Sequence, residues 1–146
     1  ERLAQNLIDT HSNTTYAQFA GMVLAKRAVE KGELSAAEQY LRDALAAGDS
    51  QSELGQLIQL RLARVLAATG EESAALAILN QSNGSLPAAY AIARGDLHLA
   101  AGRQREALNA YLEARAATLD LGSPPGLLEA KITSLESRLA NEEQSS

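Results

Sequence analysis

The stretch Gly32-Glu33-Leu34-Ser35-Ala36-Ala37 decides the fold, because two variants of it recur along the chain. The variants are Gly70-Glu71-Glu72-Ser73-Ala74-Ala75 and Gly102-Arg103-Gln104-Arg105-Glu106-Ala107. Each begins with a glycine and has an alanine five residues later. A Leu or Tyr stands four residues after that alanine. Glycine can turn the chain after a helix, and a small alanine lets the next helix approach closely. The recurrence therefore predicts three helix pairs, with glycines separated by 38 and 32 residues.

The composition favours helices throughout. Among 146 residues there are 29 Ala and 24 Leu, against only 3 Val and 5 Ile, and this balance favours helix over strand. Breaks rich in Asn, Gly, Ser and Pro at 80–87 and 122–126 separate the apolar segments. We expect helices over residues 1–10, 14–31, 34–47, 52–69, 71–81, 87–101, 103–118 and 125–141.

These helices predict an all-α solenoid, because each pair has an apolar stripe that only a neighbouring pair can cover. We expect about three and a half helix pairs and a C-terminal capping helix within one domain at 1–141. The full repeats would span 14–48, 52–82 and 87–119, the cap would span 125–141, and a disordered tail would follow at 142–146. One face of the cap carries a helically spaced apolar set, namely Leu128, Ile132, Leu135 and Leu139.

Charge and composition exclude several functions. The net charge is −5 and basic residues are not concentrated anywhere, so nucleic acid is a poor partner. The absence of cysteine excludes disulfides and thiolate metal sites. No nucleophile–base pair or metal-binding cluster is recognisable, so we expect neither an enzyme nor a bound cofactor or metal. The remaining class is a protein–protein interaction module.

The Gly-x4-Ala-x3-(Leu/Tyr) recurrence resembles the tetratricopeptide repeat family, whose period is about 34 residues, although no Trp stands early in any repeat. Longer strings extend the likeness: Thr15-Tyr16, Leu60-Arg61-Leu62-Ala63-Arg64-Val65, the run from Leu97 to Ala107 after Arg94-Gly95, and Ser-Pro-Pro-Gly-Leu-Leu-Glu-Ala-Lys-Ile at 123–132. In this order they resemble the YfgM-like proteins of Gram-negative bacteria, from about Leu3 to Leu139.

The resemblance implies an inner-membrane protein with one N-terminal transmembrane helix and a periplasmic repeat domain. Such proteins are ancillary subunits of the SecYEG translocon. They associate with the periplasmic chaperone PpiD and help exported polypeptides to reach chaperones. The chain begins at Glu1 without an anchor, so we expect it to represent the part that follows the membrane helix.

The first helix of each pair is expected to line a concave face. With the register anchored on the three glycines, the predicted partner-binding residues are Phe19, Met22, Lys26, Val29, Leu57, Leu60, Arg64, Ile92, Asp96 and Leu99. The apolar members would form a floor for an apolar segment, and Lys26, Arg64 and Asp96 would orient it. Ala25, Ala63 and Gly95 are instead expected to face the second helix of their pair.

Three alternatives stay open at this point. The C-terminal helix, or the chain before residue 1, covers the predicted groove. The chain is a soluble scaffold or co-chaperone that clamps a C-terminal carboxylate, although the clamp positions carry Met22, Arg61, Ala89 and Ala93. The third alternative is that the stack of helices serves oligomerisation.

Arg94 and the two histidines are interpreted as structural residues. Arg94 is expected to face the helix pair, where a buried charge needs a partner, so the sequence predicts a salt bridge to an acid on a neighbouring helix. His11 and His98 have no suitably spaced acidic or histidine partner, so neither is predicted to bind a metal.

Overall fold

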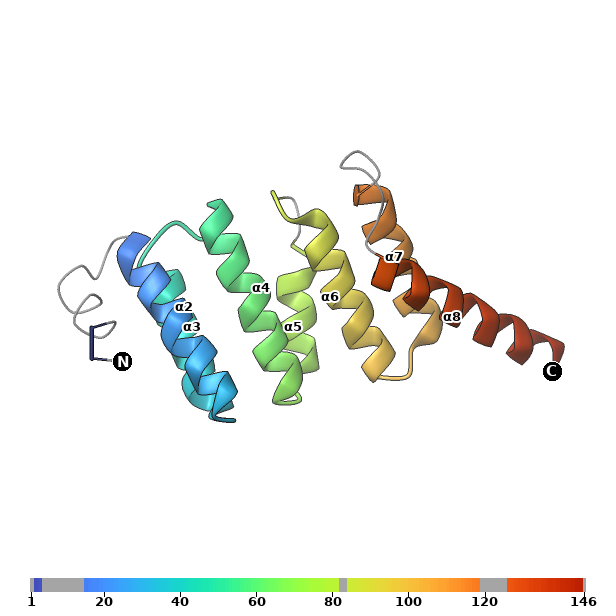
Figure 1. The fold of residues 1–146 in the computed structure, drawn as a ribbon, viewed down its shortest axis with the longest axis horizontal. Helices are drawn as coiled ribbons and strands as arrows, with labels where there is room; N and C mark the ends of the chain where they lie inside the picture. Colours follow the sequence, from blue (N-terminus) through green and yellow to red (C-terminus); the bar gives the residue numbers. More distant parts are fainter. Residues whose placement is uncertain (1, 4–14, 82–83, 119–125, 146) are drawn as a thin grey trace. The chain divides into compact units, whose positions relative to one another are not determined.

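The computed structural model describes residues 2–3, 15–81, 84–118 and 126–145, and Figure 1 shows its helices. The seven helices given for these residues are α2 (Thr15–Glu30), α3 (Leu34–Ala46), α4 (Glu53–Ala68), α5 (Glu72–Leu79), α6 (Pro87–Ala100), α7 (Gln104–Thr118) and α8 (Gly126–Gln144). No strand occurs in the described parts of the chain, and the all-α fold class is confirmed. Apart from residues 2–3, which are helical, the helix expected at 1–10 lies outside the described residues.

The three glycines that anchor the repeat pattern all adopt positive φ, at 77°, 85° and 76° for Gly32, Gly70 and Gly102. Each ends a helix with the same pair of backbone hydrogen bonds. After α2, for example, the Gly32 amide donates to the Val29 carbonyl at 3.0 Å, and the Glu33 amide donates to the Ala28 carbonyl at 2.8 Å. This arrangement satisfies carbonyls at the helix end and requires a left-handed residue. The recurrent alanines that follow are fully buried, as the sequence pattern predicts: Ala37, Ala75 and Ala107.

The contacts divide the chain into two compact units, which we describe separately: unit 1 comprises residues 1–78 and unit 2 comprises residues 79–146. In unit 1, α2 contacts both α3 and α4, and α3 contacts α4. Gly21 permits the close approach of α2 and α3, because a Cβ there would lie 2.7 Å from the Cβ of Ala44. The largest fully buried side chains of these helices are Leu41, Ile58 and Leu66.

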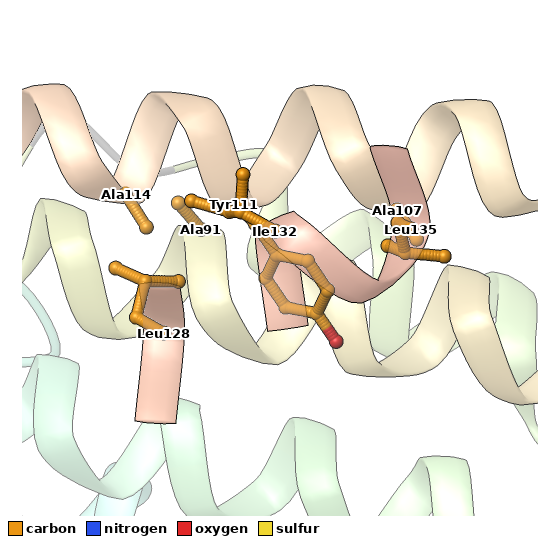
Figure 2. Packing of buried hydrophobic residues seen from close by; sticks show 7 residues of the cluster. All are labelled: Ala91, Ala107, Tyr111, Ala114, Leu128, Ile132 and Leu135. Carbon is orange, nitrogen blue, oxygen red and sulfur yellow. The ribbon is translucent and has the colours of Figure 1, made fainter. Parts of the chain in front are cut away.

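Unit 2 is built around Tyr111 of α7, whose side chain is fully buried (Figure 2). Its ring lies against Gly95 of α6, where a Cβ would come within 2.5 Å of the ring. Gly95 therefore faces the second helix of its pair, as expected from the repeat register. The buried cluster around this ring comprises Ala91, Ala107, Tyr111, Ala114, Leu128, Ile132 and Leu135.

The last helix, α8, contacts α7 and contributes Leu128, Ile132 and Leu135 to this cluster, which agrees with its predicted apolar face. It is longer than predicted, because helix continues to Gln144 where a disordered tail was expected from 142. The side chains of Glu142 and Glu143 accept hydrogen bonds from Gln104 and Arg105 at the start of α7, at 3.1 and 3.0 Å. These hydrogen bonds link the additional turn of α8 to α7. A search for apolar residues does not detect such polar contacts.

Candidate functional site

A hollow of about 400 Å³ lies in unit 1 between α2 and α4, which are blue and green in Figure 1. Its lining residues are Ala25, Lys26, Val29, Glu30, Leu34, Leu41, Arg61, Arg64, Val65 and Ala68. Leu41, Val65 and Ala25 are buried and form its inner surface, whereas Val29 is 46% exposed. The volume lies within the roughly 300–1,000 Å³ typical of ligand pockets.

Helical periodicity places these residues together. On α4, Arg61, Arg64, Val65 and Ala68 follow one another at spacings of three, one and three residues, so they share one face. On α2, Ala25, Lys26, Val29 and Glu30 follow at spacings of one, three and one residues, so they also share one face. Leu34 and Leu41 of α3 complete the lining.

The charges around the hollow are mostly positive. Lys26 lies 3.7 Å from Glu30 one turn later, and both side chains are largely exposed, so this pair contributes little to stability. Arg61 is half-buried and Arg64 is exposed. Among the described residues, no carboxylate forms a salt bridge with either arginine. Three cations and one carboxylate therefore surround an apolar hollow in a chain whose net charge is −5.

The predicted groove residues of unit 1 fall into three groups, of which the third, Met22 and Leu60, is buried. Lys26, Val29 and Arg64 line the hollow. Phe19 is 52% exposed and Leu57 is half-buried, but neither lines it.

Met22 and Leu60 do not form an exposed floor, because they are only 6% and 3% exposed. The prediction treated each helix pair as having a free face. In the structure α2, α3 and α4 all contact one another, so a face that an isolated pair would expose is covered by a helix of the neighbouring pair.

The three predicted residues of unit 2 are also engaged within the chain. Ile92 and Leu99 pack against the buried cluster that includes the apolar face of α8. Asp96 accepts a 2.6 Å hydrogen bond from the Tyr111 hydroxyl and forms a salt bridge with Lys131 of α8. These three residues of unit 2 therefore have partners within the chain, although Ile92 and Leu99 are only half-buried and Asp96 is exposed.

Tyr111 and Asp96 form a polar contact at the edge of the buried cluster. The Lys131 ammonium lies 5.2 Å from the centre of the Tyr111 ring, in addition to its salt bridge with Asp96. Burial raises the pKa of Tyr111, and the hydrogen bond to Asp96 and the charge of that carboxylate raise it further. Burial also raises the pKa of Tyr90. Tyr111 therefore stays protonated and serves as a fixed donor that joins α6, α7 and α8.

Arg94 forms the salt bridge that its position on α6 predicted. Its guanidinium pairs with Glu113 of α7 and also donates to the Leu79 carbonyl at 3.3 Å. The Arg94 side chain is 13% exposed, so these partners offset the cost of removing its charge from water.

The described residues contain no group of His, Asp or Glu side chains that could hold a metal ion. His98 accepts a 2.9 Å hydrogen bond at Nδ1 from Arg103, which indicates a structural role, and His11 lies outside the described residues. None of the described helices has the length and hydropathy needed to cross a bilayer.

The sequence reasoning missed most of the α4 wall of the hollow. It considered Arg61 only as part of a carboxylate clamp, and it assigned Ala25 to the partner helix. The signal that could have indicated the hollow is the series Arg61, Arg64, Val65 and Ala68 on one helical face, combined with small residues at 25 and 68.

Paired helices with recurrent glycine turns define a helical-repeat protein. The family model described as a tetratricopeptide repeat-like domain matches residues 1–137. The chain belongs to this tetratricopeptide repeat-like family.

The comparison with curated proteins gives a more specific relative. The chain is 39% identical over 113 residues to the ancillary SecYEG translocon subunit of Haemophilus influenzae. The match covers 76% of this chain and 54% of that protein, so the chain spans about half the length of the relative. This identity confirms the resemblance to YfgM-like proteins. No solved structure matches the chain.

Proposed function

We propose that this chain is the partner-binding part of an ancillary SecYEG translocon subunit. The observation that carries the proposal is the 39% identity to the Haemophilus influenzae protein of that name. The fold supports it, because tetratricopeptide-like helix pairs present surfaces to other polypeptides. In this role the chain acts by binding and not by catalysis.

The finer proposal concerns location and partners. The chain lies on the periplasmic side of the bacterial inner membrane, and a single N-terminal helix of the full-length protein anchors it there. It binds SecYEG, a PpiD-like chaperone and exported polypeptides, and it passes the polypeptides from the translocon to periplasmic chaperones. The hollow between α2 and α4 supports a binding role, because it combines buried apolar walls with accessible charges at the rim.

Photocrosslinking in bacterial cells tests this function. A photoreactive residue would replace Val29 in the full-length protein, because Val29 lines the hollow and is 46% exposed. The matched control replaces Gln39, which is exposed on α3 and does not line the hollow. We expect crosslinks from position 29 to translocon subunits, a periplasmic chaperone or exported chains, and none of these products from position 39. Crosslinks from position 29 only to the chain itself, or equal products from both positions, would contradict the proposed function.

A further inference from the structure

We propose that the hollow binds an acidic amphipathic segment of a partner polypeptide. One bulky apolar side chain of the segment enters the hollow, and carboxylates of the segment bind Arg61 and Arg64. This inference rests on the proposed function, and it adds the chemical class of the segment that is recognised. It follows from three features of unit 1: the apolar interior, the unpaired arginines and the spacing between them.

The interior selects for an apolar side chain. Leu41 and Val65 present buried aliphatic surface, and Val29 leaves an accessible entrance on α2. A volume of about 400 Å³ accommodates a side chain as large as Leu or Phe together with part of its backbone. A polar segment would have to leave water without hydrogen-bond partners along these walls, which is unfavourable.

The rim selects for carboxylates. Neither Arg61 nor Arg64 forms a salt bridge within the described residues, and Arg61 is half-buried. A partly desolvated guanidinium without an acid partner gains from an incoming carboxylate, which it can bind through two parallel hydrogen bonds. Lys26 on the opposite wall adds positive charge, because its contact with Glu30 is long and exposed.

The spacing favours a polypeptide over a phosphate-rich ligand. Arg61 and Arg64 lie about one turn apart on α4, so they match two acidic side chains on one segment with an apolar side chain beside them. A nucleic acid needs many cations along its backbone, whereas this chain carries a net charge of −5. An anionic lipid combines an acyl chain with a phosphate, and the experiment includes it as a competing ligand.

Selection from a phage library of random peptides of roughly twelve residues tests the proposal on the full chain. The variant is R61Q/R64Q, and the control is R27Q/R138Q, which removes the same charge at exposed positions outside the hollow. We expect the wild-type chain and the control to select peptides with Asp or Glu within four positions of Leu, Ile or Phe. In fluorescence anisotropy, R61Q/R64Q should bind those peptides at least about tenfold more weakly, because charge-assisted hydrogen bonds are lost.

Several results would overturn the proposal. Recovery of no peptide above background, selected peptides without acidic residues, or equal weakening in R27Q/R138Q would each do so. Binding to phosphatidylglycerol vesicles that R61Q/R64Q abolishes, without peptide binding, would assign the hollow to lipid instead.

Photocrosslinking separates this inference from the proposed function. If position 29 crosslinks to translocon subunits or exported chains equally well with and without R61Q/R64Q, the charge recognition is wrong but the function stands. If R61Q/R64Q removes those crosslinks and R27Q/R138Q does not, the recognition of acidic segments is supported in cells.

Discussion

Replacing Leu60 with glutamate is expected to lower the free energy of unfolding by more than about 4 kcal/mol. Leu60 is 3% exposed on α4, so the substitution removes a packed aliphatic side chain and buries a carboxylate without a partner. We therefore expect a loss of helical circular dichroism at neutral pH, or a much lower urea midpoint if the chain still folds.

Phe19→Glu is the matched control, because Phe19 is also on a first helix but is 52% exposed. Its effect on the free energy of unfolding should stay within about 1 kcal/mol. A Leu60→Glu variant with native helicity and an unchanged urea midpoint would show that Leu60 faces solvent. That result would return Leu60 to the predicted groove floor.

Replacing Tyr111 with alanine is expected to lower the free energy of unfolding of unit 2 by about 3–5 kcal/mol. Tyr111 is among the largest fully buried side chains, and its ring fills the space that Gly95 leaves between α6 and α7. The substitution opens a cavity lined by the apolar faces of three helices. Urea denaturation with circular dichroism, together with hydrogen exchange of α6, α7 and α8, would measure the loss.

Tyr111→Phe separates packing from hydrogen bonding, because it keeps the ring and removes only the hydroxyl that donates to Asp96. We expect it to cost about 1 kcal/mol, since Asp96 is still paired with Lys131. If Tyr111→Phe were as destabilising as Tyr111→Ala, the polar contact and not the ring would hold the three helices together.

Residues that act within one helix pair could be predicted from the sequence. Gly32, Gly70 and Gly102 need positive φ, and that requirement is local, so the pattern located all three turns. Gly95 was assigned to the face toward the second helix, where it contacts Tyr111. Arg94 was expected to have an acidic partner on a neighbouring helix, and it pairs with Glu113.

Contacts beyond one pair could not be predicted in the same way. Periodicity indicates which side of α2 or α4 points away from its own partner, but not which helix of another pair covers that side. Met22 and Leu60 are buried for this reason, and Ile92 and Leu99 pack against a cluster that includes α8. The hollow has the same origin, because its lining residues come from α2, α3 and α4 and lie together only after these helices have packed.

In the proposed function, the chain binds partner polypeptides in the hollow between α2 and α4. The most direct test fills the hollow with a tryptophan side chain introduced by substitution and measures photocrosslinks from position 29 in cells. Ala68→Trp is suitable, because Ala68 lines the hollow and is exposed, whereas Ala46→Trp places the same ring at an exposed position of α3 outside it. We predict that Ala68→Trp removes crosslinks to translocon subunits and exported chains and that Ala46→Trp retains them. Undiminished crosslinks in Ala68→Trp would contradict binding in the hollow and place partner binding elsewhere on the chain.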